Sequence, residues 1–215
     1  MFIGHFAVGM ALKKAEPRVS LGWYFLGVQF VDLLWPIFCL AGLESFTISP
    51  GITAYTPLDF QHYPYTHSLV AGGVWALLLA AISYFVYRSQ KASMLIAVAV
   101  LSHWALDFFT HRPDMPLAFN GPKWGLGLWN HFAATIIVET SIFIAGLYLY
   151  LSSVSFVSKK RKVAFYALVS FLLVVSFMNA FGPPPPSEEA VSYSALGLWL
   201  MVAWAHFADA EESKS

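Results

Sequence analysis

Apolar residues fill six long stretches of this 215-residue chain, and short polar segments separate them. The stretches cover residues 21–43, 68–87, 93–109, 131–152, 163–181 and 190–207. Each is close to the roughly 20 residues that a helix needs to cross the hydrocarbon core of a bilayer. The pattern therefore predicts an all-α, polytopic membrane protein with about six transmembrane helices.

A shorter apolar segment, residues 2–12, precedes these stretches; it has too few residues to cross a bilayer and is too apolar for water. Its charges, Lys13 and Lys14, follow the apolar part, the reverse of a secretory signal, so we expect mature structure. We predict a half-helix that dips into the bundle. A rise of about 1.5 Å per residue then places His5 roughly 12 Å into the membrane.

Composition supports the membrane assignment, because 58% of the residues are hydrophobic and only 11% are charged. The net charge is zero and the basic residues are scattered, so no nucleic-acid surface is expected. Cys39 is the single cysteine, which excludes a disulfide framework and a thiolate metal site. We expect one integral-membrane domain over residues 1–215, with the chemistry in 1–115 and the remaining helices in 116–215.

The distribution of Lys and Arg predicts the orientation. Ten of the twelve lie on one side of the predicted helices, and only Arg112 and Lys123 lie on the other. Since basic loops stay in the cytoplasm, both termini and the loop at 159–162 are expected there. The loops at 59–67 and 111–131 would then face outward, as in a multi-pass protein of a bacterial inner membrane.

Ionisable residues interrupt the third apolar stretch. His103, Asp107 and His111 are spaced by four residues, so they share one face if the helix continues to His111. Pro113 then ends the helix at about Arg112. An ionisable group inside a membrane span indicates a functional site whose partners lie elsewhere in the chain.

We predict those partners from the depth of each ionisable residue in the membrane. Counted from the cytoplasmic ends at about 1.5 Å per residue, Asp32, Asp107, His103 and Glu139 lie roughly 15–21 Å deep. Residues far apart in the sequence therefore bring polar groups to one layer, which a shared metal or proton site explains better than packing does. His67 falls roughly 31 Å up, so either its helix is displaced outward or it guards the mouth of the site.

Imidazole nitrogens with carboxylate oxygens favour zinc, or manganese as an alternative, in one or two ions. The predicted metal ligands are His5, Asp32, His67, His103, Asp107, His111 and Glu139. A bound ion activates water for hydrolysis, with Glu139 or Asp114 as a general base. Arg112 and Lys123 near the mouth would meet an anionic head group.

A family resemblance rests on the order Gly4-His5, Asp32, His62-Tyr-Pro-Tyr-Thr-His67-Ser68 and Ser102-His103-x-x-x-Asp107. In this order the motifs resemble the membrane-bound metal-dependent hydrolase family, the YdjM-like group, over about residues 1–115. That family typically carries Asp-x-Asp near the end of its first span. Here only Asp32 is present, so one ligand is missing or comes from Asp59, Asp114 or Glu139. The ligand order is also similar, more weakly, to that of zinc-dependent phospholipase C.

The resemblance implies a hydrolase, and the phospholipase similarity implies a phosphoester carried by a lipid or reachable from the membrane. Two other classes stay open. The carboxylates would form an ion or proton pathway in a transporter, with histidine as relay, or two facing histidines would ligate haem. A structural or partner-binding role is the remaining alternative, and the sequence leaves the oligomeric state unknown.

Overall fold

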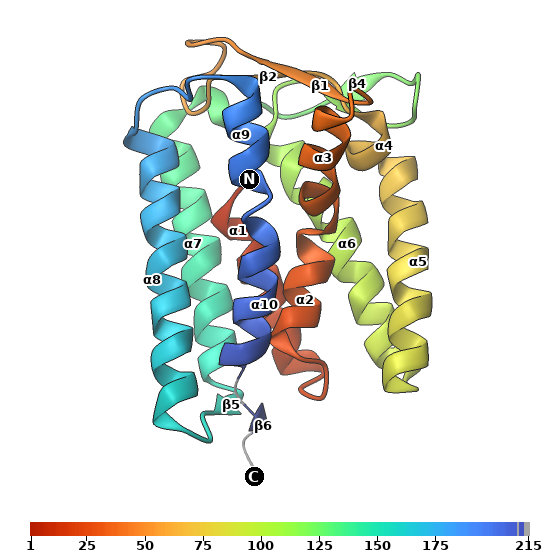
Figure 1. The fold of residues 1–215 in the computed structure, drawn as a ribbon, viewed down its shortest axis with the longest axis vertical. Helices are drawn as coiled ribbons and strands as arrows, with labels where there is room; N and C mark the ends of the chain where they lie inside the picture. The colour runs from red at the N-terminus through yellow and green to blue at the C-terminus, as the bar shows by residue number, and fades with distance from the viewer. Residues whose placement is uncertain (210, 213–215) are drawn as a thin grey trace.

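The computed structural model describes residues 1–209 and 211–212, and its helices run side by side as a bundle (Figure 1). Five helical stretches in this part of the chain are long and apolar enough to cross a membrane, and a bent pair makes up to six. The five are α5 (Leu69–Tyr87), α6 (Gln90–Thr110), α7 (Phe132–Leu151), α8 (Lys159–Phe181) and the α9–α10 stretch, Glu188–Ala208. The mostly helical, multi-pass architecture predicted from the apolar stretches is confirmed.

The first predicted span, 21–43, is not one straight helix. It forms α2 (Leu21–Val28) and α3 (Phe30–Leu40), which meet at Gln29 with a bend of 52°. Gln29 has φ −108° and ψ 4°, so the regular helix stops there and restarts one residue later. Hydrophobicity measures the length of an apolar stretch but not a break inside it, which is why the sequence missed the bend. Such irregular backbone is tolerated at membrane depth where protein covers it.

The last span is also divided, into α9 (Glu188–Ala195) and α10 (Leu198–Ala208). Ser187 caps the start of α9, since its side chain accepts a hydrogen bond from the amide of Ala190. A run of four prolines, residues 183–186, connects α8 to this cap. Proline has no amide hydrogen to donate and restricts the residue before it, so the run keeps the connection extended.

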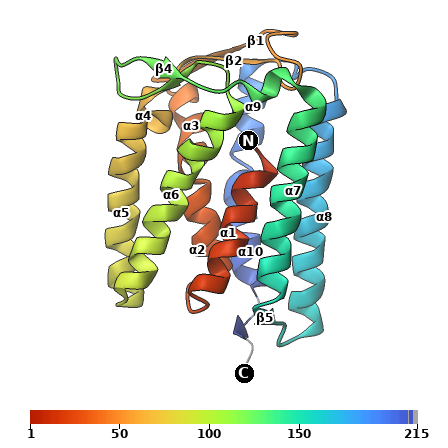
Figure 2. The same ribbon diagram turned by 180° about the vertical axis from the view of Figure 1, so that it is seen from behind.

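The predicted half-helix is α1 (Ile3–Ala15), which lies inside the bundle beside α2, α6 and α7 (Figure 2). Its residues His5, Phe6 and Met10 are buried. Contact with α7 depends on Gly146, where an added Cβ would lie 2.3 Å from the carbonyl oxygen of Ala7. A larger residue at this position would push the half-helix out of place.

The chain forms short strands as well as helices. The hairpin of β1 (Ser45–Ile48) and β2 (Leu58–His62) covers one end of the bundle (Figure 1). Helix α3 ends and helix α9 begins at this end. Two further pairs are β3 (Met115–Pro116) with β4 (Lys123–Trp124), and β5 (Val154–Ser155) with β6 (Glu211–Glu212). The short helices α4 (Pro64–His67) and η1 (Leu128–Asn130) lie near the hairpin end.

A buried ion pair fastens the opposite end of the bundle. Lys13 Nζ lies 2.7 Å from Asp209 Oδ2, and both side chains are almost fully buried. Asp209 also accepts hydrogen bonds from the amide of Leu21 (3.0 Å) and the hydroxyl of Tyr150 (3.2 Å). One carboxylate thus joins the end of α1, the start of α2, the end of α7 and the end of α10.

Candidate metal centre

Two groups of buried donor side chains meet at the centre of the bundle. The first is His5, His103 and Asp107, and the second is Asp32, His67 and His103. Within each group, one ligand atom from every residue lies within 4.8 Å of the others. Four elements supply these residues: α1, α3, α4 and α6. Both groups have the geometry to hold a metal ion, and His103 belongs to each.

His103 is oriented by the break in the first span. Its Nδ1–H donates to the carbonyl oxygen of Val28 at 2.7 Å, and Val28 is the last residue of α2. A carbonyl only accepts, so the proton of a neutral His103 is on Nδ1 and the lone pair is on Nε2. Asp32 lies in the first turn of α3, where the helix dipole favours a negative charge. The bend therefore positions both a carboxylate and the tautomer of the histidine opposite it.

His67 is oriented in the same way by Thr66 of α4 and by Glu44 of the segment between α3 and β1. Thr66 Oγ1 donates to Glu44 Oε2 at 2.7 Å, so it accepts the hydrogen bond from His67 Nδ1, also at 2.7 Å. Glu44 is held in turn by the amides of Tyr65 and Thr66, at 2.8 and 2.9 Å. The Nε2 lone pair of His67 then points toward Asp32 Oδ1, 3.2 Å away. His67 thus lies with Asp32 and His103 in the second donor group. Of the two positions that its sequence depth left open, it therefore takes the one inside the site and not the one at its mouth.

Four acceptor atoms consequently converge. His103 Nε2 lies 3.1 Å from Asp107 Oδ2 and 3.6 Å from Asp32 Oδ1, yet it makes no hydrogen bond with any described residue. His67 Nε2 joins them through Asp32. Lone pairs and negative oxygens at these separations repel one another unless a cation lies among them. The amino group of Met1 supplies a positive charge beside Asp107 Oδ1, and a proton or a metal ion among the other acceptors would relieve the remaining repulsion.

Three of the separations suit ligands of one ion. Ligands at about 2.0–2.1 Å from zinc in tetrahedral geometry lie roughly 3.3 Å apart. The separations from His103 Nε2 to Asp107 Oδ2 (3.1 Å) and to Asp32 Oδ1 (3.6 Å), and from His67 Nε2 to Asp32 Oδ1 (3.2 Å), bracket that value. Asp107 nevertheless belongs to the first group, and Asp32 and His67 to the second. Because Nε2 of His103 has one lone pair, it can ligate one ion only, so the two groups cannot both be filled through His103.

His5 and the start of α1 contact Asp107. His5 Nε2 lies 3.0 Å from Asp107 Oδ1, and its ring stacks on His103 with centroids 3.8 Å apart. The amino nitrogen of Met1 lies 2.5 Å from the same Asp107 oxygen. The predicted ligand His5 therefore belongs to the group with Asp107 and His103, and not to the group that contains Asp32.

Glu139 holds the start of the half-helix. Its Oε2 accepts hydrogen bonds from the amides of Phe2 (3.0 Å) and Ile3 (3.2 Å). These amides begin α1 and have no partner within the helix, so the carboxylate satisfies them and complements the helix dipole. Glu139 belongs to neither donor group. The two amides account for Oε2 of Glu139, while its Oε1 is buried and makes no hydrogen bond with a described residue.

His111 does not lie on the helical face predicted for it. Helix α6 ends at Thr110, and His111 has extended backbone with ψ 148°, which brings its Nε2 to 3.8 Å from Asp107 Oδ2. Its Nδ1 donates to Asp114 Oδ1 at 2.9 Å. Burial lowers the pKa of His111 despite the neighbouring carboxylates, so the ring is neutral at pH 7.

Asp114 orients His111. Its carboxylate also accepts from the hydroxyl of Tyr63 (3.0 Å) and from Arg112 Nε (3.0 Å). Burial acts to raise the pKa of Asp114, but the hydrogen bonds from His111, Arg112 and Tyr63 hold it below its ordinary value. The residue is therefore ionised and fully engaged, unlike the free base that its sequence position suggested.

The basic residues at the mouth already have partners. Arg112 pairs with Asp59 and Asp114, and Lys123 Nζ donates to the carbonyl oxygen of Gln61 at 2.7 Å. Because Asp59 pairs with Arg112, it does not supply the ligand that is missing from the Asp-x-Asp pattern of the family. These contacts fasten the β1–β2 hairpin to the loop after α6 and leave neither cation aimed at the donor groups.

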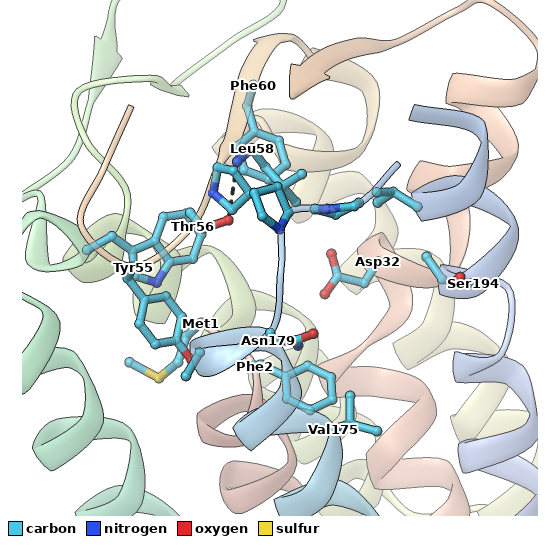
Figure 3. Close-up of a pocket in the computed structure, with 18 of the residues that line it drawn as sticks. Met1, Phe2, Asp32, Tyr55, Thr56, Leu58, Phe60, Val175, Asn179 and Ser194 are labelled. Carbon is cyan, nitrogen blue, oxygen red and sulfur yellow. Dashed lines mark hydrogen bonds between the residues drawn. The ribbon is translucent and has the colours of Figure 1, made fainter. Parts of the chain in front are cut away.

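A cavity of about 810 Å³ lies against the metal centre. Asp32, His67, Asp107 and His111 form its polar end. Its walls come from α8, α9, α10 and the loop between β1 and β2. In the close-up, Asp32, Val175, Asn179 and Ser194 surround one space, with Leu58 and Phe60 above it (Figure 3). Neither Glu139 nor Asp114 lines this cavity.

Comparison of the chain with protein-family models, curated proteins and solved structures finds no match. The functional assignment therefore rests on the geometry of the donor groups and of the cavity.

Proposed function

We propose that the protein is a membrane-embedded hydrolase that uses a divalent ion to cleave a phosphoester carried by a membrane lipid. The supporting observation is the convergence of buried acceptor atoms at the polar end of a cavity whose other walls are apolar. A soluble substrate would not need such walls. An amphiphile would place its ester at the donor groups and its chain among the helices.

One ion fits the group of Asp32, His67 and His103, and we propose that Asp107, whose Oδ2 lies 3.1 Å from His103 Nε2, completes its ligand set. Two imidazoles and two carboxylates suit zinc, with manganese as the alternative. When bound, the ion lowers the pKa of a coordinated water and polarises a phosphoryl oxygen. His5, stacked on His103, and Glu139, at the start of α1, hold the half-helix against this set.

His111 takes the role of general base in place of Glu139 and Asp114. It lines the cavity at its polar end, whereas the two carboxylates lie behind the wall. Its Nδ1 is fixed by Asp114, so Nε2 is the nitrogen that exchanges a proton with the attacking water. The hydrogen bond to Asp114 favours this tautomer and stabilises the protonated ring.

The direct test uses the full chain in lipid nanodiscs. Elemental analysis should give one equivalent of zinc or manganese, and the loaded protein should release phosphate or a phosphorylated head group from a lipid phosphoester panel. Removal of the ion by a chelator should stop the release, and the same ion should restore it. A metal-free protein, or a metal-loaded one that moves protons or cations across vesicles without hydrolysis, would reject the proposal.

The hydrogen bond between Thr66 and His67 leads to a prediction about metal affinity. Thr66→Val keeps the size of the side chain but removes the acceptor for His67 Nδ1–H, so the imidazole loses its fixed tautomer. Loss of such a supporting contact weakens metal binding by about 10–100-fold. Thr66→Ser retains the hydroxyl and should restore the affinity, as measured by competition with a fluorescent chelator. Equal affinity in both variants would show that Glu44 and Thr66 do not orient a ligand.

The orientation proposed from the basic residues is tested separately. Asn120 is exposed in the loop between β3 and β4, and Lys160 is exposed at the start of α8. In a Cys39→Ser background, a cysteine at Asn120 should react with an impermeant thiol reagent in intact cells. A cysteine at Lys160 should react only after the cells are opened. The opposite pattern would invert the proposed topology.

A further inference from the structure

The cavity is open on one side, between α8 and α9. Phe171 and Asn179 of α8 line it and are exposed, and so are Ser194 of α9 and Leu200 of α10. Asn179 and Ser194 belong to the ends of α8 and α9 that diverge, whereas Phe171 belongs to the part of α8 that contacts α10. Val174 and Phe177 lie on the outward face of α8, and their side chains are 58% and 59% exposed. An exposed apolar face of this kind is expected where a helix contacts lipid. The opening therefore leads from the cavity toward the hydrocarbon of the bilayer.

Divergence of the helices produces this opening. Helix α10 packs against α8 and α2, whereas α9 packs against α3. The division of the last span at Leu196 and Gly197 lets the second half stay with α8 while the first half moves away. The four prolines at 183–186 join α8 to α9 and also line the cavity. An extended proline run acts as a semi-rigid spacer, so it holds the two helices apart at this end.

The chemistry of the lining changes along the cavity. Asp32, His67, Asp107 and His111 supply polar groups from the side of α3, α4 and α6, while α8, α9 and α10 supply the apolar side chains of Leu172, Val175, Val191, Leu198 and Met201. Water in the apolar part would find few hydrogen-bond partners. A hydrocarbon chain fits there because it leaves one apolar environment for another. Its polar head would lie at the donor groups.

We propose that a membrane lipid phosphoester enters sideways between α8 and α9, with one hydrocarbon chain in the cavity and its phosphate at the metal centre. This proposal rests on the function proposed above and specifies the substrate as a lipid bound through its chain. The polar end of the cavity excludes a purely apolar occupant, and its apolar walls exclude a small water-soluble phosphoester as the preferred one.

The test uses the full chain in phosphatidylcholine vesicles that contain a phosphatidylglycerol with a photoactivatable diazirine on one acyl chain. Illumination should label Leu198, inside the cavity, in addition to outward residues of α8. Val175→Trp fills the cavity and should reduce labelling of Leu198 to background. Val174→Trp, the adjacent outward position, should not change it. Ser194→Trp with Tyr193→Trp as its control repeats the comparison on α9.

Metal content and hydrolysis are measured on the same samples, which separates the two proposals. Intact metal with lost labelling in the cavity-filling variants supports chain binding and shows that these variants still fold. Labelling confined to outward residues in the unaltered protein overturns the sideways route, even if the protein hydrolyses phosphoesters. Cavity labelling in a protein that never hydrolyses any ester supports chain binding and rejects the hydrolase.

Discussion

His103→Ala should remove the bound metal almost completely. His103 is the residue common to both donor groups, and its Nε2 is a buried acceptor that makes no hydrogen bond among the described residues. Without it, the buried carboxylate of Asp107 and the partly buried carboxylate of Asp32 are left with fewer positive partners, which is costly. An ion at a hundredfold its Kd stabilises a protein by about 2.7 kcal/mol, so added metal should raise the Tm of the unaltered protein but not of the variant.

Two measurements check this expectation: elemental analysis after gel filtration, and Tm in detergent with and without added ion. The matched control is His62→Ala, because His62 is an exposed histidine on β2, five residues before His67. The control should keep its metal and its metal-dependent Tm. Full metal content in His103→Ala would remove the donor groups as the binding site. Asp107→Ala should behave as His103→Ala does.

Asp209→Ala should be the most destabilising change away from the metal centre. Among the described residues, it leaves the buried Lys13 side chain with the carbonyl oxygen of Val19 as its hydrogen-bond acceptor, 3.1 Å away. Removing one member of a buried ion pair costs about 3–5 kcal/mol, since the other charge stays unpaired. The amide of Leu21 and the hydroxyl of Tyr150 each lose the hydrogen bond to this carboxylate as well.

The free energy of unfolding of this variant is measured by denaturant titration in mixed micelles. Lys14→Met serves as the control, because Lys14 is the exposed neighbour of Lys13 and should change stability little. The double variant Lys13→Met with Asp209→Leu removes both charges and should recover part of the loss. If the single and double variants were equally unstable, the charge pairing would not be the cause.

This ion pair also bears on the metal centre. Lys13 ends the half-helix that carries His5, so the pair with Asp209 sets the height of His5 in the bundle. Glu139 fixes the other end of the same helix through the amides of Phe2 and Ile3. We therefore expect Asp209→Ala to weaken metal binding modestly in addition to lowering stability.

The amino-acid sequence by itself determined the membrane class, the approximate helices and the polar residues that meet. Apolar stretches of spanning length are a direct consequence of bilayer thickness, so α5, α6 and α7 follow from counting residues. The polar layer followed from the constant rise of a helix, because counting residues from the cytoplasmic ends places Asp32, His103 and Asp107 at similar depths. Both kinds of inference use distance along a single helix.

Only the tertiary structure decided how these residues are used. Glu139 and Asp107 have similar predicted depths, yet one holds the amides of α1 and the other lies in a donor group. Depth fixes position along the membrane normal but not direction around the helix or distance between helices. Glu44 and Thr66 were missed as partners of His67, although Thr66 precedes it directly and Glu44 follows the first apolar stretch.

The bend at Gln29 and the opening beside α9 depended in the same way on contacts between segments far apart in the chain. The carbonyl of Val28 became a partner of His103 because α2 packs on α6, and the cavity formed because α9 packs on α3 and not on α8. Hydrophobicity is a property of each residue alone, whereas tautomers, ion pairs and cavities are properties of neighbours brought together by folding. The composition of the site was therefore readable in the sequence, and its geometry was not.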